Sequence, residues 1–151
     1  MSRSVILSPV IARWLLVACA ILAGWIVFQP QPTLANDGID RLAGILRDLQ
    51  VPEQFTTRFR VGALLNMILF IPLAACAMLA FPRMRWTEIT VAGFVISLAI
   101  EVSQGVLMAH RMAESIDIVT NTAGALLGAL LVTVLQHSAP GDPSAERPHH
   151  S

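Results

Sequence analysis

Four apolar runs of about twenty residues constrain this chain more than any other feature of its sequence. They cover residues 10–28, 61–81, 89–108 and 116–135. Each run is about long enough to cross the hydrocarbon core of a bilayer as an α-helix. Only 13% of the 151 residues are charged, whereas a soluble domain has about 25%. The sequence therefore predicts an all-α integral membrane protein, a bundle of four transmembrane helices.

The first apolar run has two interpretations. Arg3 and Arg13 precede an apolar stretch that is followed by residues 33–35, Thr-Leu-Ala, a pattern typical of a secretory signal with a cleavage site. Alternatively the run is a retained helix, in which Arg13 reaches the interface and Trp14 and Trp25 lie near the two membrane surfaces. The sequence favours the retained helix, and both interpretations place the N-terminus in the cytoplasm.

Residues 29–60 form the longest connection between apolar runs. Asn36 and Asp37 can cap a helix, and apolar residues then recur at helical spacing up to Leu49, before Pro52. This segment is too short and too charged to cross a membrane. We expect an amphipathic helix in this outer loop, either lying on the membrane surface or packed over the bundle.

The positions of arginine predict an orientation. Arg83 and Arg85 lie in the short connection between the second and third runs, and short basic connections stay in the cytoplasm. Four crossings then place both termini in the cytoplasm, and we expect a bacterial inner membrane. We expect the N-terminus and first helix at residues 1–28 and the outer loop at residues 29–60. A core of three helices follows at residues 61–135, and a disordered tail at residues 136–151.

Composition argues against several classes of protein. The net charge is zero and the chain has no lysine, so no basic patch indicates nucleic acid. Cys19 and Cys76 lie within apolar runs, at no spacing typical of a metal site or a disulfide framework. We expect no metal, no cofactor and no nucleic-acid partner. We expect membrane lipids to be the molecules that the protein contacts. The oligomeric state stays open.

Polar residues gather on one face of each of the last two runs. Spacings of four, three and four place one set on a single face of the third run: Ser97, Glu101, Gln104 and Met108. The same spacings define a face of the fourth run: Asp117, Asn121, Gly124 and Gly128. Two glycines four apart let a neighbouring backbone approach closely. This face is therefore expected to point toward the other helices, with Leu126 on the opposite side, facing lipid.

The second run adds a polar residue at a similar depth. Asn66 lies in its outer half, and Pro72 at mid-span removes one backbone hydrogen bond, so a local kink is expected. Arg60 and Arg111 lie just outside the apolar runs. The uncommon polar groups are therefore expected near one level, in the outer half of the membrane.

Three interpretations of these polar groups stay open. In the first, they line an outward-facing pocket, where Arg60 and Arg111 hold the phosphate or carboxylate of a lipid headgroup or lipid-linked envelope precursor. Glu101 and Asp117 then balance charge and bond hydroxyls or amides. In the second, Glu101 or Asp117 is the general base of a membrane enzyme acting on a lipid-linked substrate, although no nucleophile, metal or phosphate-loop motif supports it.

The third interpretation is structural. Asn66, Gln104 and Asn121 would hydrogen-bond across helices, each contributing about 0.6–2 kcal/mol. Glu101 and Asp117 would pair with Arg111 or Arg60. The chain would then act as an assembly partner in a membrane complex. The number of polar groups at one level exceeds what four short helices need for cohesion. The sequence therefore favours a ligand-binding, non-enzymatic protein.

The ordered set of these residues resembles the VanZ-like membrane protein family. The resemblance rests on Asn66-x5-Pro72, Glu101-x2-Gln104 and Arg111-x5-Asp117-x3-Asn121-x2-Gly124-x3-Gly128, and it covers about residues 58–135. The chain departs from the pattern at His110, where members often have glycine, and at Glu114, an added charge. The founding member is linked to resistance to the glycopeptide teicoplanin, so the resemblance implies a cell-envelope protein with an outward-facing site.

Overall fold

The computed structural model describes residues 8–28, 33–107 and 115–138, and this part of the chain holds helices and no strand. The helices are α1 (Pro9–Val27), α2 (Thr33–Asp48), the short 3-10 helix η1 (Glu53–Phe55), α3 (Arg58–Ala80), α4 (Trp86–Leu107) and α5 (Ser115–Ser138). Four of them, α1, α3, α4 and α5, are long and apolar enough to cross a membrane. The predicted four-helix membrane bundle is confirmed.

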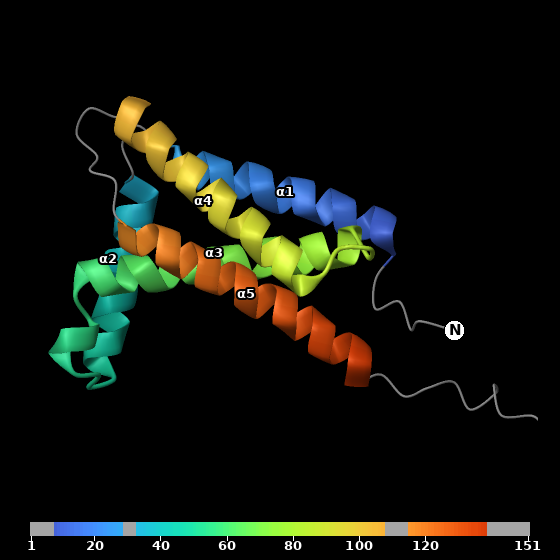
Figure 1. The fold of residues 1–151 in the computed structure, drawn as a ribbon. Helices are drawn as coiled ribbons and strands as arrows, with labels where there is room; N and C mark the ends of the chain where they lie inside the picture. The colour runs from blue at the N-terminus through green and yellow to red at the C-terminus, as the bar shows by residue number, and fades with distance from the viewer. Residues whose placement is uncertain (1–7, 29–32, 108–114, 139–151) are drawn as a thin grey trace, which may run out of the picture.

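The four long helices run alternately up and down (Figure 1). The start of α1 and the end of α5 therefore lie at one end of the bundle. The end of α1, the start of α3, the end of α4 and the start of α5 lie at the other end, where α2 crosses the bundle. Helix α3 packs against α1, α2, α4 and most extensively α5, while α4 packs mainly on α5. Residues that are distant in the sequence thus meet at the α2 end.

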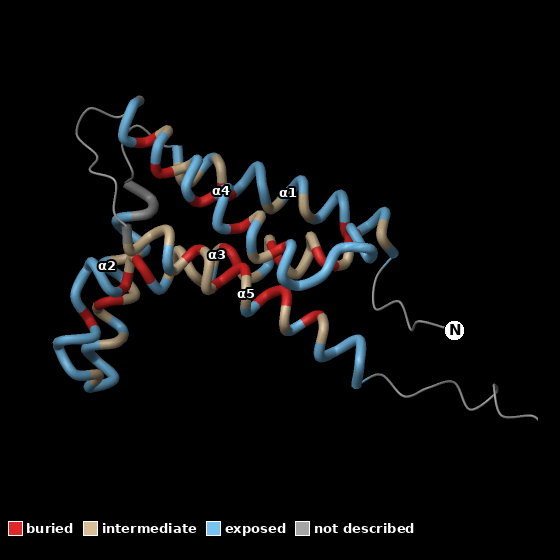
Figure 2. The backbone as a smooth tube through the Cα atoms, viewed as in Figure 1, coloured by how far each residue is buried: buried red, intermediate tan, exposed pale blue. Residues whose placement is uncertain are grey.

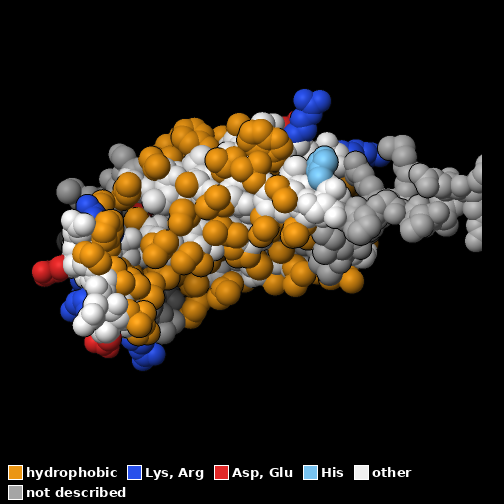
Figure 3. All heavy atoms as spheres, turned by 90° about the horizontal axis from the view of Figure 1, so that it is seen from below, with side chains coloured by type: hydrophobic (Ala, Val, Ile, Leu, Met, Phe, Trp, Pro, Cys, Tyr) orange, Lys and Arg blue, Asp and Glu red, His pale blue; other side chains and the backbone are white. Residues whose placement is uncertain are grey.

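The outer surface of the bundle has the distribution of side chains that a bilayer requires. Buried residues lie on the helix faces that point inward (Figure 2). Apolar side chains cover the middle of the molecule, and charged side chains gather at its two ends (Figure 3). Trp14, Ile21 and Val106 are more than two-thirds exposed, which is costly in water but favourable against lipid tails. The chain is a multi-pass membrane protein.

The glycine face of α5 packs directly on the backbone of α3. A Cβ atom added at Gly124 would lie against the carbonyl oxygen of Met67 and 2.9 Å from the Cβ of Phe70. One at Gly128 would lie against the carbonyl oxygen of Ile71 and 3.1 Å from the Cβ of Ala74. The absence of side chains is what allows this close approach. Helix α3 continues from Arg58 to Ala80 through Pro72 without a break.

Leu126, which the sequence predicts to face lipid, is half-buried. Helix α4 also packs on α5, with Gly93 so close to Ala125 that an added Cβ would lie 2.5 Å from the Ala125 side chain. Helix α5 is therefore covered on two sides. Leu127 and Leu131 are exposed and mark the face of α5 that lipid can reach.

Helix α2 begins earlier than its sequence predicts. Asn36 and Asp37 do not cap it, because the helix starts at Thr33, and residues 33–35 include no helix breaker. Its end has the Schellman pattern: Gln50 has a φ of 59°, and the amides of residues 50 and 51 donate to the carbonyls of residues 47 and 46. The structure confirms the prediction of an amphipathic helix in the loop between the first and second apolar runs.

One face of α2 packs on α3 and another stays exposed. Ala43 is fully buried, and a Cβ added at Gly62 of α3 would lie 3.4 Å from Ile39. Arg58 forms an exposed ion pair with Asp40 at 3.2 Å. Ile45 of α2 nevertheless remains 54% exposed, so α2 both contacts the bundle and presents an apolar edge. That this edge lies on the membrane surface stays a prediction.

The two cysteines meet between α1 and α3, a contact that their sequence spacing does not predict. Both are half-buried, and their thiols lie close enough to interact. We expect copper phenanthroline, an apolar oxidant, to join Cys19 and Cys76 within one chain in intact membranes. After denaturation, the two cross-linked cysteines would not react with a maleimide-polymer until their disulfide is reduced.

A Cys76→Ser variant is the control for this cross-link, because it leaves one thiol that is labelled with or without the oxidant. Full labelling of both cysteines after oxidation would contradict the packing of α1 on α3. A mature chain that has lost Cys19 would show that the first apolar run is cleaved.

Candidate functional site

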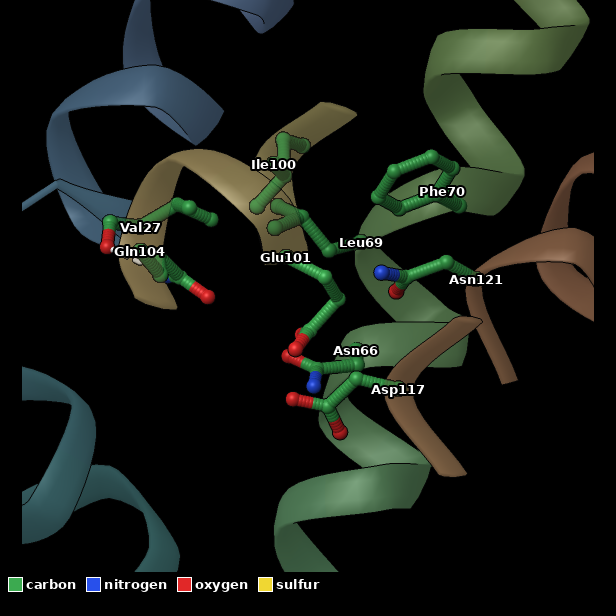
Figure 4. A pocket seen from close by; sticks show the side chains of 9 residues that line it. All are labelled: Val27, Asn66, Leu69, Phe70, Ile100, Glu101, Gln104, Asp117 and Asn121. Carbon is green, nitrogen blue, oxygen red and sulfur yellow. Dashed lines mark hydrogen bonds between the residues drawn. The ribbon is translucent and has the colours of Figure 1, made fainter. Parts of the chain in front are cut away.

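Polar side chains from three helices surround a small cavity at the α2 end of the bundle. Its polar lining is Asn66 from α3, Glu101 and Gln104 from α4, and Asp117 and Asn121 from α5; we call these five residues the polar cluster. Apolar groups of Val27, Leu69, Phe70 and Ile100 complete the walls (Figure 4). The cavity volume is about 20 Å³, which accommodates about one water-sized group.

The geometry of α4 and α5 brings these side chains together. Glu101 and Gln104 lie three residues apart and Asp117 and Asn121 four apart, so each pair shares one helix face. The last turns of α4 lie beside the first turns of α5, since the two helices pack together. In Figure 4 the side chains of Glu101 and Asp117 point toward the same region, beside the amide of Asn66.

Burial divides the cluster into an inner part and a mouth. Glu101 and Gln104 are each 4% exposed and Asn121 is 5% exposed. Asn66 and Asp117 are half-buried, so they form the accessible edge of the cavity. A carboxylate buried this deeply between membrane helices is costly and is rarely found without a partner or a function.

Hydrogen bonds within the site leave one acceptor unused. The Nε2 of Gln104 donates to the backbone oxygen of Val27 at 3.0 Å, which ties α4 to the end of α1. The Nδ2 of Asn121 donates to the hydroxyl of Ser97 at 2.9 Å, and that hydroxyl donates to the backbone oxygen of Asp117 at 3.5 Å. Within the described residues, the buried Oδ1 of Asn121 has no hydrogen-bond partner.

Of the two predicted arginines, Arg60 is not among the residues that line this cavity. The guanidinium of Arg60 donates to the backbone oxygen of Gln54 at 2.6 Å and lies over the ring of Phe55, 5.5 Å from its centroid. The position of Arg60 in the first turn of α3 puts it beside η1 and away from the polar cluster. Arg111 lies outside the described residues, as does the predicted tail beyond Ser138.

Ser97 is not among the binding residues that the sequence predicts, although it lies on the same helix face as Glu101. Ser97 is fully buried and fixes the amide of Asn121, so it orients a wall of the cavity. Its signal was the four-residue spacing to Glu101. The apolar walls gave no signal, because such residues occur throughout the bundle. Within residues 8–28, 33–107 and 115–138, no three His, Cys, Asp or Glu side chains are grouped to hold a metal ion.

A family model described as VanZ/LLP1 matches residues 16–136. This chain belongs to the VanZ/LLP1 family. The match includes α1 from residue 16 onward and every residue of the polar cluster, so the cavity of this VanZ/LLP1 protein lies entirely within the family region. No match to the chain was found among curated proteins or among solved structures.

Proposed function

We propose that this VanZ/LLP1 protein binds the polar headgroup of a membrane lipid or lipid-linked envelope precursor at the polar cluster. The observation that carries the proposal is the gathering of five polar side chains from three helices around one cavity in a membrane bundle. Polar and ionisable groups at such a position are a functional site by default. The half-buried mouth at Asn66 and Asp117 gives a headgroup a way in.

The site is proposed to face away from the cytoplasm. The connection with Arg83 and Arg85 lies at the end of the bundle opposite the cluster, and short basic connections stay in the cytoplasm. The protein then lies in a bacterial inner membrane with both termini inside. An envelope role fits such a site, because envelope precursors are displayed on the outer side; a link to glycopeptide resistance or envelope stress is part of this proposal.

Reporter fusions test this orientation. Fusions after residue 86 and at the C-terminus are expected to report the cytoplasm, because both follow the retained basic connection. A fusion near residue 112 is expected to report the outside. A C-terminal fusion that reports the outside would contradict the proposed orientation.

Bound lipid in the purified protein tests the proposed binding. We expect native mass spectrometry of protein gently extracted from membranes to show about one retained phospholipid, as a single headgroup site implies. Glu101→Gln and Asp117→Asn should lose it, since each replaces a carboxylate of the cluster by an amide of nearly equal shape. Glu88→Gln, the same change at an exposed residue of α4, is the matched control. Equal lipid retention in all four proteins would contradict a headgroup site at the cluster.

A further inference from the structure

An open cleft lies where α2, η1 and the start of α3 meet. Its lining residues are Arg47, Glu53, Thr56, Thr57 and Arg58; we call it the arginine cleft. None of these residues lines the cavity of the polar cluster, so the two places are separate. Thr56 is buried and the other four residues are exposed. The cleft has a volume of about 270 Å³, enough for a lipid headgroup, whereas the other cavity accommodates about one water-sized group.

Each arginine of the cleft is anchored by one of its nitrogens. The Nε of Arg47 donates to the backbone oxygen of Ala43 at 3.2 Å. The Nη1 of Arg58 lies 3.2 Å from a carboxylate oxygen of Asp40. Because a guanidinium group has five N–H donors in one plane, both side chains keep further donors for a ligand. An anchored side chain also loses less conformational freedom when a ligand binds to it.

The remaining side chains of the cleft add a donor and an acceptor. The hydroxyl of Thr57 accepts a hydrogen bond from the amide of Arg60 at 3.4 Å, so its own proton is left to donate. The hydroxyl of Thr56 donates to the backbone oxygen of Glu53 at 3.2 Å, which ties η1 to the start of α3. The described lining thus carries two guanidinium groups against one carboxylate. It suits an anion with a single negative charge.

We infer that the arginine cleft binds the phosphodiester of an anionic phospholipid, such as phosphatidylglycerol, as a second lipid site of this protein. The planar N–H groups of arginine match two oxygens of a phosphate group. A phosphodiester has one negative charge, and the hydroxyls of a glycerol headgroup can donate to Glu53. Phosphatidylcholine would instead bring a cation close to two arginines, and its trimethylammonium has no donor for Glu53.

The position of the cleft favours a lipid over a soluble phosphate as its ligand. Arg58 begins α3, which is long and apolar enough to cross a membrane. The cleft therefore lies beside the hydrocarbon core, at the level of the lipid headgroups. The same segments expose the apolar side chains of Ile45, Phe55 and Phe59, and charged side chains lie among apolar ones at this end of the molecule (Figure 3). Such a surface is typical of a segment that contacts anionic lipids.

The test is a ligand series with purified wild-type protein. Short-chain phosphatidylglycerol, short-chain phosphatidylcholine and inorganic phosphate are each titrated by thermal unfolding in a non-ionic detergent at physiological salt. Phosphatidylglycerol should bind about tenfold or more tightly than either of the others, because two arginines each attract an anionic lipid. Equal affinity for the two lipids would overturn the anionic headgroup. Inorganic phosphate that binds as tightly as phosphatidylglycerol would overturn a lipid as the ligand.

Arginine variants locate the binding. Arg47→Gln and Arg58→Gln should each weaken phosphatidylglycerol binding by about fivefold. Arg41→Gln is the matched control, since it removes the same charge from an exposed residue of α2 that does not line the cleft. It should change the affinity by less than about twofold, because salt screens charges that do not contact the ligand. Equal losses in all three variants would overturn the cleft as the binding site.

A variant of the polar cluster separates this site from the proposed function. Lipid in the open cleft exchanges with detergent, so the phospholipid expected to remain in purified protein is the one at the polar cluster. Glu101→Gln should therefore lose that phospholipid and still bind added phosphatidylglycerol like the wild type. Binding that is lost in Glu101→Gln and unchanged in the arginine variants would overturn the cleft and leave the polar cluster. Because the ligand series uses only wild-type protein, it tests the inference even where a variant does not fold.

Discussion

Replacing Gly124 or Gly128 by leucine is expected to leave almost no folded protein. An added side chain at either position meets a backbone carbonyl of α3, at Met67 or Ile71. A backbone atom inside a helix cannot turn aside as a flexible side chain can, so the two helices must separate. Overpacking a core costs about 1–3 kcal/mol where side chains can rearrange, and the cost should be higher here. Monodispersity in detergent and the midpoint of thermal unfolding measure the loss.

Two controls show whether position or chemistry causes this effect. Gly105→Leu is the same substitution at an exposed glycine of α4 that has no described atom within 4 Å of an added Cβ. Leu131→Phe adds volume on the exposed face of α5. Both should fold like the wild type. If Gly124→Leu and Gly128→Leu were as stable as these controls, the contact between α3 and α5 would be wrong.

The sequence predicts much of the fold because the information is local. Apolar length is enough to indicate four crossings, and three- and four-residue spacings are enough to place Glu101 with Gln104 and Asp117 with Asn121 on helix faces. A Gly-x-x-x-Gly pair indicates a close helix contact. These signals can be found without knowing which helices are neighbours. In the structure, Glu101, Gln104, Asp117 and Asn121 all line one cavity.

The remaining features depend on tertiary neighbours. Arg60 was expected at the pocket, but its long side chain finds a nearer acceptor in the backbone at Gln54. Leu126 is predicted to face lipid but is half-buried, and α4 packs on the same helix where Gly93 meets Ala125. The meeting of Cys19 with Cys76 depends on how α1 lies on α3. No periodicity in one helix encodes such contacts between helices.

The second large effect concerns Glu101, which separates a binding site from structural cohesion. Glutamine has nearly the shape of glutamate and keeps an acceptor oxygen, so Glu101→Gln should preserve the packing of α4 against α5. In a hydrated cavity it should unfold within about 1 kcal/mol of the wild type, in the range of a mutation that breaks no buried network. It should nevertheless lose bound phospholipid and fail to complement a deletion strain under envelope stress.

A purely structural role predicts the opposite result. Removing one member of a buried ion pair costs about 3–5 kcal/mol, because its partner is left charged and buried. Glu101→Gln would then be strongly destabilised, and a second substitution at Arg111 would restore part of the stability.

The most direct measurement of the central claim therefore records two quantities on the same preparation of Glu101→Gln. They are the midpoint of thermal unfolding and the amount of phospholipid retained in native mass spectra, each relative to wild type and Glu88→Gln. A headgroup site predicts a midpoint close to that of the wild type with the retained phospholipid lost. A lowered midpoint that a second substitution at Arg111 restores, with phospholipid retained whenever the chain is folded, would contradict it.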